Sequence, residues 1–280
     1  MITEEKIKEL KHIARLLRID VLKMLNRVGS GHTGGSLSSI EIIVSLYFHY
    51  MKHNPEDPLW ADRDKFVLSK GHAAPALYAA LARCGYFALS DLMTLRSMGS
   101  KLQGHPDMKV TPGVEVSTGS LGQGLSLANG LALASRLDKR RAKVYIILGD
   151  GEVQEGQVWE AAMSSAHFRL DNLCAVLDFN GLQIDGKVKD IMNIDPISDK
   201  WKAFGWEATV IDGHNFSEIL KAFTWAEGVK GKPSIIIAKT IKGKGVSIFE
   251  NNVKYHGVPP TDEELTFALE ELSVTESEKN

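Results

Sequence analysis

Apolar residues near the start of the chain recur at the spacing of one helical face. They are Ile7, Leu10, Ile13, Leu17 and Val21. Residues three or four positions apart share one side of an α-helix, so the pattern predicts a helix from about Thr3 to Val28, with Thr3 as its N-cap. The glycine-rich stretch from Gly29 to Gly35 is expected to end this helix, and a second helix is expected from about Ser36 to Tyr50.

The rest of the chain alternates short apolar runs with helical segments. The expected strands are 65–69, 143–148, 173–178, 207–211 and 234–237. The expected helices are 73–83, 119–137, 155–168, 216–229 and 261–272. Alternation of this kind, with strands that are apolar throughout, predicts an α/β fold: a doubly wound, mostly parallel sheet with helices on both faces. We expect one domain, 1–272, followed by a polar tail, 273–280, that is disordered.

Composition narrows the class of protein. The chain has 280 residues, 44% of them apolar and 24% charged, which excludes disordered and collagen-like proteins. Its net charge is −2 and its basic residues are dispersed, so neither a nucleic-acid surface nor a membrane-seeking face is expected. No apolar run approaches the ~18 residues of a spanning helix, and the N-terminus lacks a signal-peptide core. We therefore predict a cytoplasmic protein, in which Cys84 and Cys174 are reduced core thiols.

An aspartate between two glycines follows the strand predicted at 143–148. Ligands of open parallel sheets bind beyond the carboxyl ends of the strands, where Asp150 is expected to lie. Gly149 and Gly151 allow the backbone to approach a ligand closely. The N–H groups at the start of the following helix favour an anion at the same place. A carboxylate that faces an anion requires a cation between them.

A second polar motif, DFNG, ends the next strand at Asp178 to Gly181. Asn180 follows Asp150 by one strand–helix–strand unit, so the two are expected to be neighbours in space. Their oxygens are typical ligands of Mg²⁺ that also binds a diphosphate and water. Taken singly, the first motif is better explained as a strand-ending turn and the second as an Asx turn, but their spacing and matching strand ends together favour the metal site.

Six motifs along the chain resemble, in the same order, the diphosphate-binding part of transketolase, a thiamine diphosphate enzyme. They are GHTGGSLS, SKGHAAPALYAAL, TGSLGQGLSLANGLALA, GDGEVQEGQVWEA, DFNGLQIDG and KTIKGKG. The resemblance extends from about Ile13 to Pro260. It implies the thiamine diphosphate-binding fold and, as cofactors, thiamine diphosphate with Mg²⁺, for which Ca²⁺ or Mn²⁺ can substitute.

The resemblance also implies roles for individual residues. The metal ligands would be Asp150, the side chain of Asn180 and the backbone carbonyl of Leu182. The cofactor would contact Lys70, His72, Gly119, Ser120, Leu121, Gly151, Asn180 and Lys242. The catalytic histidines would be His32, His72, His105 and His256, and Glu155 would lie at a subunit interface that links paired cofactors.

Histidines suit a reaction that removes a proton from a ketose and returns one to an aldose. An ordinary imidazole, with a pKa near ~6.5, can exchange both protons at neutral pH. A single histidine is about as often structural, and no function is expected for the others considered, His12, His53, His167 and His214. His12 and His167 are expected on helix surfaces or in the core.

Three further features of the motifs concern the surroundings of the expected cofactor. Lys242 and Lys244 fit either a lid over a diphosphate or solvated loop charges. Gly34 and Gly35 stand where many transketolases have bulkier residues, so a roomier donor pocket is expected. The apolar stripe of Leu125, Ala128 and Ala132 is better explained by packing.

In transketolases, the glutamate that activates the cofactor belongs to a pyrimidine-binding domain, which this chain lacks. The resemblance therefore implies the N-terminal subunit of a split transketolase, inactive alone, with two copies each of this chain and a separate pyrimidine-binding partner. It would transfer a two-carbon ketol unit from a ketose phosphate to an aldose phosphate. Three alternatives remain: a subunit of another thiamine enzyme, such as a 2-oxo acid dehydrogenase or deoxyxylulose-phosphate synthase; a split transketolase for an unusual sugar; and a non-catalytic binding protein.

Overall fold

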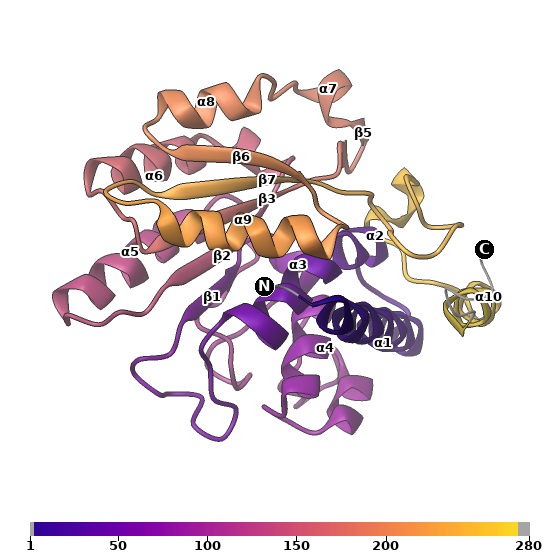
Figure 1. The fold of residues 1–280 in the computed structure, drawn as a ribbon. Helices are drawn as coiled ribbons and strands as arrows, with labels where there is room; N and C mark the ends of the chain where they lie inside the picture. Colours follow the sequence, from indigo (N-terminus) through magenta and orange to yellow (C-terminus); the bar gives the residue numbers. More distant parts are fainter. Residues whose placement is uncertain (1–2, 274–280) are drawn as a thin grey trace.

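The centre of the protein is one five-stranded parallel sheet (Figure 1). The structure is a computed structural model, and it describes residues 3–273. The strand order is β1 (Lys65–Leu68), β2 (Val144–Gly149), β3 (Leu173–Phe179), β7 (Ser234–Lys239) and β6 (Glu207–Asp212). The predicted strands and the α/β fold class are thus confirmed.

Side chains of the sheet alternate between two hydrophobic cores. Tyr145 and Ile147 of β2 belong to one core, while Ile146 and Leu148 belong to the other. This follows from the strand geometry, because successive side chains point to opposite faces. One face is covered by α1 (Glu4–Val28), α3 (Ile40–Ser45), α4 (Ala74–Cys84) and α9 (Phe216–Gly228). The other is covered by α5 (Gly124–Leu137), α6 (Gly156–His167) and α8 (Ile197–Ala203).

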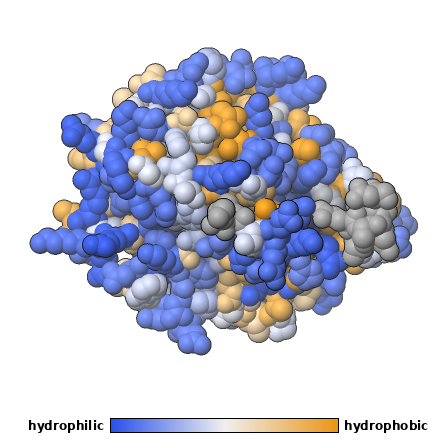
Figure 2. All heavy atoms as spheres, viewed as in Figure 1, coloured by the Kyte–Doolittle hydropathy of each residue, from blue (hydrophilic) through white to orange (hydrophobic). Residues whose placement is uncertain are grey.

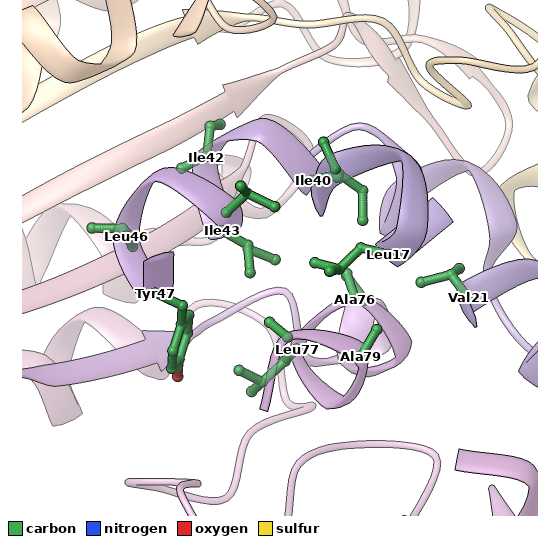
Figure 3. Close-up of a cluster of buried hydrophobic side chains, with 14 of the residues drawn as sticks. Leu17, Val21, Ile40, Ile42, Ile43, Leu46, Tyr47, Ala76, Leu77 and Ala79 are labelled. Carbon is green, nitrogen blue, oxygen red and sulfur yellow. The ribbon is translucent and has the colours of Figure 1, made fainter. Parts of the chain in front are cut away.

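The first core joins helices that are distant along the chain. Figure 3 shows Leu17 of α1, Ile40 of α3 and Leu77 of α4 in one cluster of buried side chains.

Hydrophilic side chains cover most of the molecular face drawn in Figure 2, with apolar ones in a few groups. No helix among residues 3–273 is both long enough and apolar enough to cross a membrane. Cys84 and Cys174 are free thiols, as expected, and Cys174 is buried.

The ends of α1 are those predicted from the sequence. The Thr3 hydroxyl accepts a hydrogen bond from the Lys6 amide at 3.2 Å, which caps the first turn. Gly29 has a left-handed φ of 63°, and its amide donates to the Leu25 and Asn26 carbonyls. This is the common C-terminal arrangement in which glycine is favoured. At the other end of the chain, α10 (Asp262–Ser273) includes Ser273, and the rest of the predicted tail, 274–280, lies outside the described residues.

The single helix predicted for 36–50 is wrong. The segment contains α2 (Thr33–Leu37), α3 and a π-helical turn, Leu46–Tyr50, so the glycine break is also shorter than expected. Between α2 and α3, the Ser38 and Ser39 hydroxyls donate to Asp178 Oδ2 at 2.6 and 3.3 Å. These long-range bonds hold the chain in a turn where the local pattern favours a continuous helix.

Several short elements were not expected from the sequence. They are the 3₁₀ turns η2 (Gly71–Ala73), η3 (Leu89–Thr94), η4 (Glu152–Gln154) and η5 (Val253–His256), the hairpin of β4 (Leu182–Gln183) and β5 (Gly186–Lys187), and the helices α7 (Val188–Ile191) and α8. The helix expected from residue 119 begins only at Gly124, so residues 119–123 form a loop. Most of these turns and loops lie at the quoted motifs, where the chain leaves the sheet.

Gly124 begins α5 in direct contact with Ser69, at the end of β1. A Cβ atom here would overlap the Ser69 side chain and lie 2.9 Å from its Cα. We expect Gly124→Ala to lower the free energy of unfolding by about 1–3 kcal/mol, because the backbones must separate. Gly130 of the same helix faces open space, so Gly130→Ala should raise stability by up to about 1 kcal/mol. Denaturant unfolding of both variants checks this, and equal effects would contradict it.

Candidate functional site

A cavity of about 390 Å³ lies at the carboxyl ends of the central strands. Most of the residues singled out in the sequence line it: His32, Lys70, His72, His105, Gly119, Leu121, Asp150, Gly151, Glu155, Asn180, Leu182, Lys242 and His256. Ser120 does not line it, because its side chain is exposed in the turn beside Leu121. Segments from across the whole sequence therefore meet at one place.

The loops that follow β2 and β3 are adjacent, as expected. Gly149 is paired in register with Asp178, which places Asp150 beside the DFNG turn. Asp150 Oδ2 accepts a hydrogen bond from the Gly181 amide at 2.5 Å, and Oδ1 accepts one from the Gly151 amide at 2.8 Å. Asn180 Oδ1 accepts from the Leu182 amide at 3.1 Å. The two predicted metal-binding side chains thus belong to one bonded pair of turns.

Among residues 3–273, no basic side chain forms an ion pair with the Asp150 carboxylate, although the more distant Lys242 charge lowers its pKa in part. Burial raises its pKa from 3.8 to about 7, and the nearby Asp178 charge adds to this rise, although the Gly181 and Gly151 amides oppose it. In the part of the chain that the structure describes, no three His, Cys, Asp or Glu side chains converge as metal ligands. A cation here would therefore rest on Asp150, an amide oxygen, a carbonyl oxygen and oxygens of a bound ligand, a donor set that suits Mg²⁺.

Asp178, which was not expected to have a role of its own, does have a cationic partner. It is fully buried and forms an ion pair with Lys70, whose Nζ also donates to the Gly35 carbonyl at 2.7 Å. Burial raises the pKa of Asp178, but Lys70 and the Ser38 and Thr240 hydroxyls outweigh it, and the pKa falls to about 2. The sequence signal was a charged residue at the end of an apolar strand.

Lys242 extends into the cavity from the loop after β7. Its Nζ donates to the Leu182 carbonyl at 3.1 Å and lies 2.7 Å from His256 Nδ1. Burial, with repulsion from Lys70, lowers the pKa of Lys242 to about 8. The alternative of a solvated loop charge is therefore wrong for Lys242. Lys244 does not line the cavity and pairs with Glu250 at 3.2 Å.

Three of the four predicted catalytic histidines form a cluster. The ring centroids of His32 and His72 are 5.0 Å apart, and that of His256 is 5.5 Å from each. His105 is more exposed, and its ring packs on Gly119, where a Cβ atom would lie 2.9 Å from His105 Cδ2. The buried Nδ1 of His32 has no hydrogen-bond partner among the described residues.

The expectation of ordinary histidine pKa values is wrong for this chain alone. Burial lowers the pKa of His32 and His256 to about 4, and nearby cations, among them Lys242, add to the fall. Burial and Lys70 hold the pKa of His72 well below its ordinary value, and burial and Arg96 lower that of His105. At neutral pH the cluster is therefore uncharged, and its nitrogens serve as hydrogen-bond donors and acceptors.

A second buried carboxylate, Glu152, was missed by the sequence reasoning. It accepts hydrogen bonds from the Ser69 hydroxyl, from the Gly122 amide at 2.9 Å and from the Gly149 amide at 3.0 Å. Glu152 thus links the three motifs that contain Ser69, Gly122 and Gly149. Its position directly after the Gly-Asp-Gly turn was the sequence signal that could have indicated this role. Glu155, by contrast, is exposed at the start of α6 and lines the cavity.

Gly34 and Gly35 allow close packing of the side chains of the site. A Cβ atom at Gly34 would lie 2.8 Å from Lys242 Cγ, and one at Gly35 would lie 3.2 Å from His72 Nε2. Site residues therefore pack closely beside both glycines, and the expected roomier donor pocket stays a prediction.

The histidines for which no function was expected lie outside the cavity. His12 and His167 are exposed on helices, and His53 bonds to Tyr47 and Tyr86. His214 bonds to the buried Glu41 at 3.0 Å and also accepts a hydrogen bond from the backbone after β7.

Comparison with known families and proteins gives a consistent result. The family described as "Transketolase, thiamine diphosphate binding domain" matches residues 8–279. The 6-deoxy-6-sulfo-D-fructose transketolase subunit of Clostridium sp. (strain MSTE9) is 48% identical over 96% of this chain and 98% of its own length. An apulose-4-phosphate transketolase subunit of Phocaeicola vulgatus is 40% identical over 90% of each chain.

Longer relatives match this chain over part of their own length. Human transketolase is 43% identical over 91% of this chain but only 41% of its own length. The crystal structure of Campylobacter jejuni transketolase superposes with a TM-score of 0.89 at 37% identity, over 94% of this chain and 42% of that one. The chain thus spans about two fifths of the length of these transketolases.

The raised pKa of Asp150 predicts a pH dependence of stability. The metal-free folded chain binds a proton at Asp150 up to about pH 7, whereas the unfolded chain releases it near pH 3.8, so stability falls as pH rises between these values. Asp150→Asn removes this loss. We expect the unfolding free energy of the variant minus that of the wild type to grow by roughly 2–4 kcal/mol from pH 4 to pH 8. Urea unfolding across this range checks it, and a constant difference would contradict it.

Proposed function

Because the chain belongs to the transketolase family, we propose that it is the diphosphate-binding subunit of a two-chain transketolase. The enzyme transfers a two-carbon ketol unit from a ketose phosphate to an aldose phosphate. The observation that carries this proposal is the meeting of the Asp150 and Asn180 turns in a cavity that also contains two buried lysines and a histidine cluster. A non-catalytic protein would have no need to retain this arrangement.

In this proposal the residues at the strand ends hold the cofactor and its metal ion. Asp150, the Asn180 side-chain oxygen and the Leu182 carbonyl bind Mg²⁺, or Ca²⁺ or Mn²⁺ in its place. Lys70 and Lys242 offset the negative charge of the diphosphate, and Gly119, Ser120, Leu121 and Gly151 offer close backbone approach. Thiamine diphosphate, when bound, supplies a nucleophilic carbon and an electron sink.

The histidines orient the sugar and exchange its protons. His256 Nδ1 lies against Lys242, which leaves its Nε2 for a substrate hydroxyl. The buried Nδ1 of His32 is available as well, because it has no partner among the described residues. Burial is the main cause of the lowered pKa values of His72 and His256, and an anion beside Lys70 and Lys242 would offset only the smaller contribution of those two charges.

A partner chain completes the site. Two relatives that match this chain along most of their length are named as transketolase subunits, whereas single-chain transketolases are more than twice as long. The partner supplies the pyrimidine-binding domain with the activating glutamate, and the assembly contains two copies of each chain. Glu155, exposed beside the cavity, faces the interface in this arrangement.

A second candidate is a transketolase for a specialised sugar. It is favoured by the 48% identity to a subunit named for 6-deoxy-6-sulfo-D-fructose, a ketose with a sulfonate in place of the usual phosphate ester. The two candidates share all chemistry at the reacting carbons. They differ only in the group at the far end of the sugar, so substrate profiling distinguishes them.

Reconstitution tests the proposed function directly. This chain, mixed with its partner subunit, thiamine diphosphate and Mg²⁺, should transfer ketol units from fructose 6-phosphate or its 6-sulfo analogue to an aldose phosphate, followed by chromatography of the products. Neither chain alone should do so. Full activity of this chain by itself would contradict the proposal.

Two substitutions separate binding from chemistry. Asp150→Ala should abolish Mg²⁺-dependent binding of thiamine diphosphate, because the diphosphate loses its bridge to the protein. His32→Ala should leave the cofactor Kd within about threefold while lowering kcat by about 10²–10⁴, the usual range for a lost proton-transfer group. Calorimetry and steady-state kinetics of the assembled enzyme measure both. Unchanged cofactor affinity in Asp150→Ala, or lost affinity with normal turnover in His32→Ala, would reverse these assignments.

A further inference from the structure

The position of Lys242 depends on a tightly packed loop, residues 239–245. Gly243 and Gly245 have left-handed φ values of 80° and 97°. A Cβ atom would overlap the Phe249 carbonyl at the first and the Arg18 side chain at the second. The Gly243 amide also donates to the Gly34 carbonyl at 3.0 Å. These contacts restrict the loop backbone to one conformation, and Lys242 lies in the middle of the loop.

His214 fixes the start of this loop from outside the cavity. Its Nε2 accepts a hydrogen bond from the Ile241 amide at 2.8 Å, and its Nδ1 lies 3.0 Å from Glu41 Oε2. A backbone N–H can only donate, so Nε2 carries the lone pair and Nδ1 carries the proton. The imidazole is thus held as one neutral tautomer, between a buried carboxylate and the residue that precedes Lys242.

Arg18 of α1 fixes the other side of the loop. Its Nε donates to the Lys244 carbonyl at 2.8 Å, and its Nη2 lies 2.5 Å from Glu41 Oε1. Glu41 is buried in α3, and burial raises its pKa, but Arg18 and His214 outweigh burial and bring the pKa to about 2. The carboxylate is therefore charged and holds both arms of the clamp.

We propose that Glu41, Arg18 and His214 form a positioning clamp that fixes Lys242 toward the anionic part of the cofactor. The clamp bonds the backbone on both sides of Lys242, at Ile241 and Lys244. Its side chains come from α1, from α3 and from the loop between β6 and α9. A buried ion pair carries a desolvation penalty that well-packed apolar residues would avoid, so stability alone does not account for it. The inference rests on the proposed function, because it assigns the clamp to diphosphate binding.

Substitutions at His214 test the clamp. His214→Leu removes both bonds, whereas His214→Gln keeps one acceptor and one donor on its amide. We expect His214→Leu to speed amide hydrogen exchange of residues 240–245 at least tenfold and to raise the thiamine diphosphate Kd of the assembled enzyme about tenfold, while His214→Gln restores much of both. Asp20→Asn is the control, because it breaks the Asp20–Arg83 ion pair between α1 and α4 without touching the loop.

The control decides between positioning and general stability. If Asp20→Asn speeds loop exchange and weakens cofactor binding as much as His214→Leu does, the clamp has no specific role and the inference is overturned. Unchanged loop exchange in His214→Leu overturns it as well. A wild-type chain that fails to bind thiamine diphosphate with its partner contradicts the proposed function alone, since the exchange result does not depend on which ligand binds.

The wild-type chain offers a test that needs no variant. Nitrogen-15 NMR of the His214 ring should show the neutral Nδ1–H tautomer, with a scalar coupling between Nε2 and the Ile241 amide nitrogen across their hydrogen bond. The Nε2–H tautomer, or an imidazolium at neutral pH, would overturn the inference. This measurement remains decisive if His214→Leu proves too unstable to fold.

Discussion

Two buried aspartates at the ends of neighbouring strands impose the main electrostatic constraint on this protein. Asp178 satisfies its charge within the chain, through Lys70 and two hydroxyl groups. Within the described residues, the hydrogen bonds to Asp150, one strand away, come from the Gly151 and Gly181 amides, and its pKa is raised by burial and by Asp178. The folded chain is therefore built to keep one carboxylate short of positive charge. In the proposed function, a divalent cation would supply the missing positive charge and link Asp150 to the negatively charged diphosphate.

The other charged groups of the cavity follow from the same constraint. Lys70 and Lys242 are both buried, and their positive charges help keep His72 and His256 neutral in the chain alone. A bound anion would offset the part of this effect that comes from the lysine charges, but not the larger part that comes from burial. Because the Glu41 clamp holds the loop of Lys242 from the far side, the arrangement also depends on residues that never line the cavity.

The sequence predicted those features that depend on local periodicity and on strand ends. The parallel strands and the adjacency of Asp150 and Asn180 could be inferred, because apolar runs and one strand–helix–strand unit determine them. The break between α2 and α3 could not, because Ser38 bonds to Asp178, 140 residues away. The part played by His214 was hidden for the same reason: its partner Glu41 is 173 residues distant. The lowered histidine pKa values likewise arise from packing among separate motifs.

In the proposed function, one cation is held jointly by the turns after β2 and β3. The most direct measurement is a crystal structure of the two-chain assembly with thiamine diphosphate and Mn²⁺, in which the metal is located by its anomalous scattering. We expect a single peak within coordination distance of Asp150, the Asn180 side-chain oxygen and the Leu182 carbonyl, with the diphosphate on its other side. A peak elsewhere, or a diphosphate bound without either side chain, would contradict it.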